Sequence, residues 1–70
     1  MDLRERLSFN IQRLRRERGL SQEALAFRAG INRGYMNDIE NCKSAATIDK
    51  IETIARALDV DPAELLAPRA

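Results

Sequence analysis

Histidine is absent from this 70-residue sequence, and cysteine occurs once, at Cys42. One chain therefore offers neither a zinc site nor the imidazole base on which much nucleophilic catalysis depends. Ser8 and Ser21 have no base to activate them, and so short a chain leaves little room for a substrate pocket. A lone thiol forms no intrachain disulfide, which fits a reducing cytoplasm. We therefore expect a cytoplasmic protein that is not an enzyme and that needs no metal or cofactor.

Long apolar runs and strand patterns are also missing. No apolar stretch approaches the roughly 20 residues that span a bilayer, so we expect no membrane association. There is no alternating run and no Asn-Gly or Asp-Gly hairpin dipeptide. Hydrophobic residues make up 44% and charged residues 33% of the chain, a composition typical of soluble globular proteins. We expect one domain over residues 1–70, which needs very regular packing or a partner to be stable.

The net charge of +1 hides an uneven distribution of charge along the chain. Residues 13–43 carry a net charge of +3, residues 44–70 carry −2, and residues 1–12 are neutral. A basic part beside an acidic part is typical of a protein with a nucleic-acid face opposite a solvated or partner face. The alternative is an ordinary solvated helix surface that happens to be rich in arginine.

Helical periodicity runs through the whole sequence and predicts an all-α fold. We expect helices over residues 2–18, 22–29, 33–41, 48–58 and 62–66. In the fourth of these, the expected inward face consists of Ile48, Ile51, Ile54, Ala55 and Leu58.

The boundaries of these helices carry recognisable start and stop residues. Ser21, Asn32 and Thr47 are good N-caps, because a side-chain oxygen can accept from an orphan N–H of the following turn. Gly19 and Gly30 stand where a helix commonly ends in the left-handed conformation. Proline also fits the first turn of the last predicted helix, where its missing N–H is harmless.

Residues 22–41 contain two short helices separated by a turn with a glycine. A turn of this kind makes the second helix cross the first steeply and projects its N-terminal end outward, so that it can enter the major groove of DNA. The exposed start holds Asn32, Arg33, Gly34 and Asn37, none of which is needed for a core. Arginine donors match guanine O6 and N7, and asparagine can pair with adenine. Any small helical bundle has such turns, so the spacing alone leaves a purely structural role open.

The segment GLSQEALAFRAGINRGYMNDIEN, residues 19–41, resembles the helix-turn-helix of the phage Cro/CI repressor family, also called the XRE family. The similarity continues through ATIDKIETIARALDV, residues 46–60, and DPAELL, residues 61–66. The run NRGYMNDIE is most similar to short regulators such as restriction-modification controller proteins. The resemblance implies a compact five-helix, lambda-repressor-like domain, usually a homodimer on a palindromic operator.

The resemblance also implies a role for each residue that matches the family pattern. The implied DNA-contacting set is Gln22, Tyr35 and Lys43 at the phosphate backbone, and Asn32, Arg33, Gly34, Asn37 and Asp38 at or beside the base edges. Arg15 and Glu40 match a partly buried salt bridge that ties the first helix to the third. Arg13, Arg16 and Arg18 either attract DNA or form ordinary helix surface.

Two positions depart from the family pattern. Cys42 stands where the family often has glycine, so the third helix must end differently, with Asn41 as the expected left-handed residue. Gly34 replaces a longer side chain and removes one possible base contact. Its functional interpretation is a close approach of the backbone to DNA, and the alternative is tolerance at a fraying first turn.

The acidic C-terminal end has more apolar positions than one small core readily covers. We expect a dimer interface at Val60, Leu65 and Leu66, with Leu65 as its anchor; the alternative is that Leu65 closes the monomer core. Phe9 and Phe27 lie off the apolar stripes of their helices and either fill gaps beside the core or form an interface.

The sequence therefore predicts a homodimeric transcription regulator that binds double-stranded DNA and acts by occupying its operator. A module that masks a protein partner, for example an antitoxin with secondary DNA binding, is the alternative.

Overall fold

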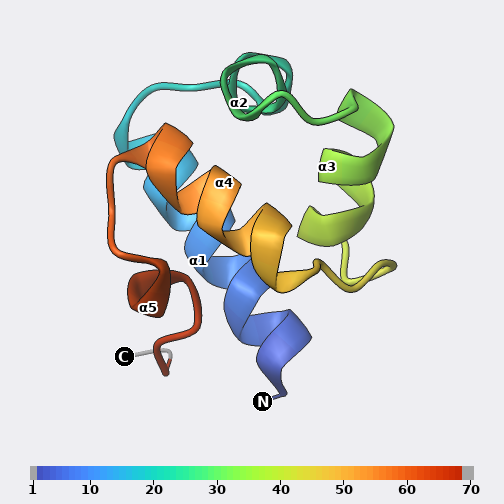
Figure 1. Cartoon of the computed structure of the whole chain (residues 1–70), viewed down its shortest axis with the longest axis vertical. Helices are drawn as coiled ribbons and strands as arrows, with labels where there is room; N and C mark the ends of the chain where they lie inside the picture. The colour runs from blue at the N-terminus through green and yellow to red at the C-terminus, as the bar shows by residue number, and fades with distance from the viewer. Residues whose placement is uncertain (1, 69–70) are drawn as a thin grey trace.

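The computed structural model of the chain describes residues 2–68, which fold into five α-helices joined by short connections (Figure 1). The helices are α1 Leu3–Glu17, α2 Gln22–Ala29, α3 Arg33–Glu40, α4 Ile48–Leu58 and α5 Pro62–Leu65. No strand occurs within the described residues, which confirms the all-α prediction. None of these helices is long and apolar enough to cross a membrane.

The helix boundaries follow the local start and stop residues closely. The predicted bounds of α2 and α4 are confirmed, whereas α1, α3 and α5 each end one residue earlier than expected. The reason is the same at all three ends: Arg18, Asn41 and Leu66 are C-cap residues whose backbone has left the helical conformation. Helix α1 also begins one residue later than expected, because Asp2 is its N-cap.

Side-chain oxygens cap the N-terminus of every described helix. The predicted caps are present: Ser21 accepts from the Ala24 N–H, and Thr47 accepts from the Lys50 N–H. The sequence analysis did not anticipate the cap of α1, where Asp2 and Glu5 form a reciprocal capping box. Such caps satisfy backbone donors that would otherwise lack a partner.

The end of α3 corrects one expectation. Asn41 has φ −101° and is not left-handed; Cys42 is, with φ 61°. The Cys42 N–H donates to the Ile39 carbonyl at 3.2 Å, and the Lys43 N–H donates to the Asp38 carbonyl at 2.8 Å. This is the Schellman pattern, which requires the left-handed residue one position after the C-cap, and that position is 42.

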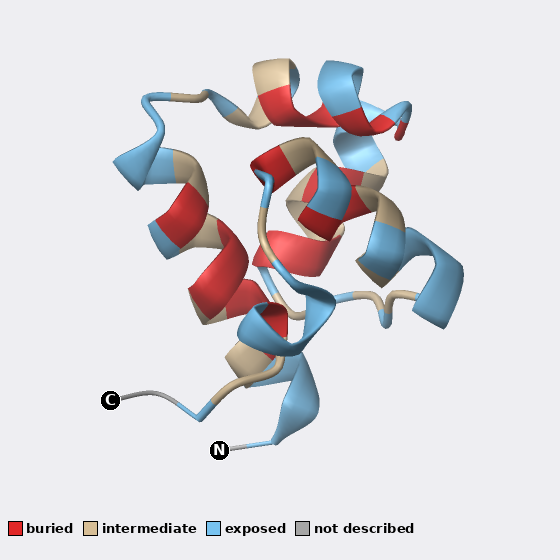
Figure 2. Ribbon diagram, turned by 60° about the vertical axis from the view of Figure 1, so that its left-hand side comes forward, coloured by how far each residue is buried: buried red, intermediate tan, exposed pale blue. Residues whose placement is uncertain are grey.

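The core lies where the helices converge, and Figure 2 shows their buried positions facing inward. Thirteen apolar residues in the described part of the chain are buried: Leu7, Ile11, Leu14, Leu25, Ala26, Ala29, Ile31, Met36, Ile39, Ile54, Ala55, Leu58 and Leu65. The prediction of Leu65 as an interface anchor is therefore wrong, because Leu65 is 0% exposed and closes the monomer core. Ile48 was expected inside and is 84% exposed.

The C-terminal segment is held against α1 by a buried amide. Asn10 Nδ2 donates to the carbonyls of Leu65 and Ala67, both at 3.0 Å. Because Asn10 is only 2% exposed, its amide would be costly to bury without these acceptors. The contacts fix α5 on the body and leave α2 and α3 at the other end of the molecule (Figure 1).

Candidate nucleic-acid interface

The turn between α2 and α3 has a fixed geometry. Gly30 lies in the left-handed region with φ 64°, and the Ile31 N–H donates to the Ala26 carbonyl at 2.9 Å. Ile31 is also buried, so its side chain anchors the turn to the core. Figure 1 shows α2 nearly end-on and α3 from the side, as expected for a steep crossing. The N-terminal end of α3 is therefore presented on a rigid support.

The first turn of α3 is capped and exposed. Asn32 Oδ1 accepts from the Gly34 N–H at 2.7 Å and from the Tyr35 N–H at 3.3 Å. A Cβ at residue 34 would lie only 3.0 Å from the same Oδ1. Glycine at this position therefore makes room for the cap, a reason that the sequence analysis did not consider. Asn32, Arg33 and Gly34 are all exposed.

Arg33 forms an ion pair that the sequence analysis missed. Its Nη1 lies 3.2 Å from Glu23 Oε2, and the two side chains are 70% and 73% exposed. Glu23 belongs to the first turn of α2, so the pair bridges the starts of the two helices. The spacing of ten residues is not a pairing pattern within one helix, and only the turn geometry brings the two groups together.

Gln22 and Asn37 form the next layer of this surface. Gln22 Nε2 donates to Glu40 Oε1 at 3.2 Å, and its Oε1 accepts from Asn37 Nδ2 at 3.1 Å. Asn37 Oδ1 in turn accepts from Asn41 Nδ2 at 3.1 Å. Gln22 and Asn37 are half-buried, and each amide atom used here retains a second hydrogen-bonding position. The two amides are thus oriented before any ligand arrives.

The ion pair implied by the resemblance is present beneath this layer. Arg15 Nε and Nη2 donate to the two oxygens of the Glu40 carboxylate at 3.0 and 3.1 Å. The side chains are 12% and 2% exposed. Arg15 Nη1 also donates to the Leu20 carbonyl at 2.9 Å, so one guanidinium joins α1, α3 and the loop before α2. A paired, planar contact of this kind fixes orientation as well as charge.

The remaining predicted residues are Tyr35 and Asp38 in α3 and Lys43 in the loop that follows this helix. Tyr35 Oη donates to the Ala45 carbonyl at 3.2 Å, which holds the half-buried ring along this loop. Lys43 is exposed, and Asp38 is half-buried with its carbonyl accepting from the Lys43 N–H. Tyr35 therefore belongs to the first turn of α3, and its hydroxyl contacts the loop after the helix, in which Lys43 lies.

Comparison with known proteins places this arrangement in a family. Residues 11–65 match the family model described as HTH_3, helix-turn-helix. The protein belongs to this helix-turn-helix family.

The relatives of this helix-turn-helix protein are regulators of transcription. The chain is 37% identical over 68 residues to an uncharacterized HTH-type transcriptional regulator, y4dJ, of Sinorhizobium fredii, covering 97% of this chain and 88% of that protein. The crystal structure of a hypothetical transcription factor from Neisseria has a TM-score of 0.93 at 37% identity, covering 96% of this chain and 77% of that one. The predicted similarity to controller proteins is confirmed as well.

One of these controller proteins is C.Esp1396I, whose structure is a tetramer in complex with its natural 35 base-pair operator. Its TM-score is 0.84 at 32% identity, and the match covers 93% of this chain and 86% of that chain.

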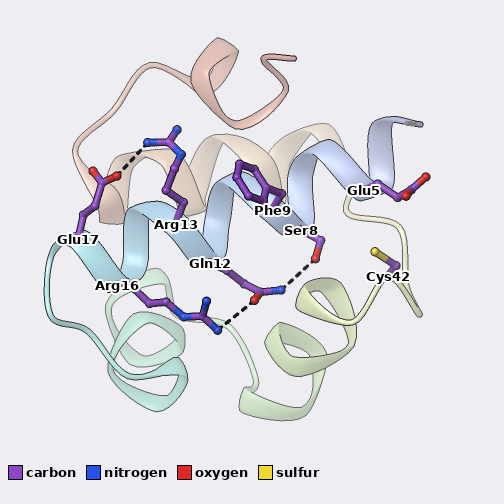
Figure 3. Close-up of a pocket in the computed structure, with 8 residues that line it drawn as sticks. All are labelled: Glu5, Ser8, Phe9, Gln12, Arg13, Arg16, Glu17 and Cys42. Carbon is purple, nitrogen blue, oxygen red and sulfur yellow. Dashed lines mark hydrogen bonds and ion pairs between the residues drawn. The ribbon is translucent and has the colours of Figure 1, made fainter. Parts of the chain in front are cut away.

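A shallow depression lies on the outer face of α1 of this helix-turn-helix protein (Figure 3). Its lining includes Ser8 and Cys42, two nucleophilic side chains for which the sequence offers no histidine base. Ser8 Oγ donates to the Glu40 carbonyl and so serves the packing of α1 on α3. Gln12 Nε2 donates to the same carbonyl at 2.8 Å. These contacts hold the helix-turn-helix on α1.

The predicted interface residues differ in burial, and Leu65 lies in the core. Val60 and Leu66 are half-buried and pack against the core. Leu66, together with exposed Ile48, lines an apolar groove between α4 and α5. Ile51 and Pro62 complete its apolar wall. Leu66 is the only one of the three predicted interface residues that lines this groove.

Proposed function

We propose that this helix-turn-helix protein is a cytoplasmic, sequence-specific DNA-binding regulator of transcription that acts as a homodimer on an inverted-repeat operator. One observation carries the proposal. The rigid turn at Gly30 presents an exposed α3 start, with Arg33 and Asn32 and without large apolar side chains. A helix end of this size and chemistry fits the major groove of B-DNA, which is about 12 Å wide. The protein then needs no cofactor or metal, because occupancy of the operator is its whole action.

The proposed contacts divide into base-reading and backbone-positioning groups. Arg33 reads guanine through O6 and N7, and Asn37 reads adenine with the second hydrogen-bonding positions of its amide. Asn32, Gly34 and Asp38 border these two. Gln22, Tyr35 and Lys43 contact phosphates on either side and set the register of α3 in the groove.

The proposed dimer forms through the groove between α4 and α5. Ile48 is 84% exposed at its edge, and Leu66 lies in its wall, so a second copy would remove both from water. Val60 lies nearby at the start of the connection to α5. A two-fold axis here keeps the acidic C-terminal part away from phosphates and presents both α3 helices to one side of the duplex. Sedimentation that finds a monomer even at high micromolar concentration would remove the dimer from the proposal.

A protein-masking module is the second candidate function, and one observation favours it. Phe27 is 87% exposed on α2, where its ring offers a partner protein a large apolar contact. If a small partner protein co-purifies with the wild type and is lost from Phe27→Ser while DNA binding is unchanged, the protein has this second role. If the wild type and Phe27→Ser co-purify with the same proteins, the second role is refuted and regulation by DNA binding alone remains.

The experiment that tests the proposal is selection of bound sequences from a pool of random duplex DNA. We expect an inverted repeat whose half-site centres lie about 10 base pairs apart, one turn of B-DNA. Enrichment of no sequence over the starting pool would refute sequence-specific binding.

The same selection repeated with Arg33→Ala tests the base-reading role. We expect preference to be lost at one position in each half-site and affinity for the selected operator to fall by about 1–3 kcal/mol. Affinity for a scrambled duplex should fall much less, because Arg33 supplies there only one of several phosphate contacts. If affinity for all sequences weakens equally, Arg33 contacts phosphate and the assignment is wrong.

A further inference from the structure

The exposed ion pair between Glu23 and Arg33 places a carboxylate on the surface that we assign to DNA. Glu23 Oε2 is 3.2 Å from Arg33 Nη1, and it follows Gln22, a proposed phosphate contact, in the chain. Negative charge beside a phosphate backbone weakens binding to any DNA sequence. The Glu23 carboxylate therefore weakens DNA binding at this surface, unless its effect is to orient the Arg33 guanidinium with which it pairs.

The pair does little for folding. Both side chains are about 70% exposed, and ion pairs with that exposure contribute little to stability because water screens them. The buried pair of Arg15 with Glu40 carries out the structural task of joining helices. The effect of Glu23 must therefore be sought in what Arg33 does.

Arginine can keep this partner while it reads a base. The guanidinium has five N–H donors, and a bidentate contact with guanine uses two of them. The recorded contact with Glu23 uses one donor, on Nη1. The guanidinium can thus hold Glu23 and guanine together, and the carboxylate then limits its rotation in the groove.

At a wrong base the balance is different. Arg33 finds no matching acceptors there and must turn to a phosphate, which separates it from Glu23. The carboxylate is then left close to the DNA backbone without its counter-charge, and like charges repel. This repulsion weakens binding at mismatched sites and is absent at the matching site.

We propose that Glu23 is a specificity-determining positioning residue, which orients Arg33 for guanine and penalises its use on phosphates. The inference rests on the proposed function, because it assumes that the start of α3 meets DNA. It concerns discrimination between DNA sequences and leaves the fold unaffected.

The test compares Glu23→Gln with the wild type on the selected operator and on a scrambled duplex, at one salt concentration. We expect binding to the scrambled duplex to strengthen roughly two- to fivefold, the range of one exposed charge interaction. Binding to the operator should change less than twofold, so the ratio of the two affinities falls. In an Arg33→Ala background, Glu23→Gln should strengthen both duplexes equally and leave the ratio unchanged.

Glu17→Gln is the matched control. It removes the same charge from another exposed pair, with Arg13 at 3.1 Å, on a helix outside the motif. An unchanged affinity ratio in Glu23→Gln, or an equal fall in Glu17→Gln, overturns the inference and leaves the proposed function standing. If the wild type itself does not distinguish the operator from the scrambled duplex, the proposed function fails and the inference fails with it.

Discussion

Arg15→Ala removes the guanidinium that joins α1 to α3. Glu40 would keep only the hydrogen bond from Gln22, at 3.2 Å, for a carboxylate that is 2% exposed. The Leu20 carbonyl would lose its donor on Arg15 as well. The substitution therefore leaves a buried charge without its counter-charge, which is among the most costly changes that one residue can cause.

The size of the expected loss of stability follows from the burial of the pair between Arg15 and Glu40. Removing one partner of a fully buried ion pair costs about 3–5 kcal/mol. Arg15 is 12% exposed, so we expect the low end, about 3 kcal/mol. A domain of this length has a total stability of roughly 4–10 kcal/mol. The thermal midpoint should accordingly fall by about 12–24 °C, since 1 kcal/mol shifts the midpoint of a small domain by about 4–8 °C.

Thermal unfolding followed by circular dichroism measures this shift, and Arg13→Ala is the control. The control makes the same substitution on the same helix but breaks an exposed pair, so we expect a loss of no more than about 1 kcal/mol. Arg15→Met combined with Glu40→Leu should recover most of the lost stability, because apolar residues can replace a buried pair. An Arg15→Ala midpoint equal to that of Arg13→Ala would refute the reasoning.

Three further outcomes are expected. Because Gln22, Lys43 and their neighbours supply about 6–10 phosphate contacts per dimer, affinity for the operator should fall roughly 10³–10⁵-fold between 50 and 200 mM salt; a flat titration would contradict this. Leu65→Ala should cost about 2–5 kcal/mol of stability. Leu66→Glu should leave helical content intact and give a monomer in sedimentation; a Leu66→Glu protein that still forms the dimer would move the interface elsewhere. Cys42→Gly relieves about 1–2 kcal/mol of left-handed strain but adds the roughly 0.5–1 kcal/mol entropy cost of glycine, so the thermal midpoint should rise by about 2–8 °C; a lower midpoint would show that the turn is not strained.

The helices and most of their caps could be predicted from the sequence because their causes are local. Ser21, Asn32 and Thr47 act on the backbone two or three residues ahead, and Gly30 adopts its own left-handed conformation. Each of these signals lies within one turn of the helix end that it determines. The error at Asn41 has the same local origin, since moving the helix end by one residue moves the left-handed position with it.

The errors in burial arose where the position of one helix on another decides the outcome. Leu65 and Leu66 are adjacent and equally apolar, yet only the rotation of α5 on the body places the first in the core and the second in a groove. Ile48 shares the apolar face of α4 by periodicity but stands at its first residue, beyond the edge of the core. Periodicity states which residues share a face and does not state how far along the helix that face is covered.

On the helix-turn-helix surface, too, some features have local causes in the sequence and others depend on how the helices pack. The sequence identified Arg33 and Gln22 from their positions in a pattern, but it gave no sign of the groups that hold them. Glu23 is ten residues from Arg33, and Glu40 is eighteen from Gln22, so neither pair follows a helical spacing. The left-handed Gly30 turns α3 back across α2 and brings both pairs within hydrogen-bonding distance. A contact residue can therefore be proposed from the pattern alone, whereas the carboxylates that pair with it can be identified only once the turn is built.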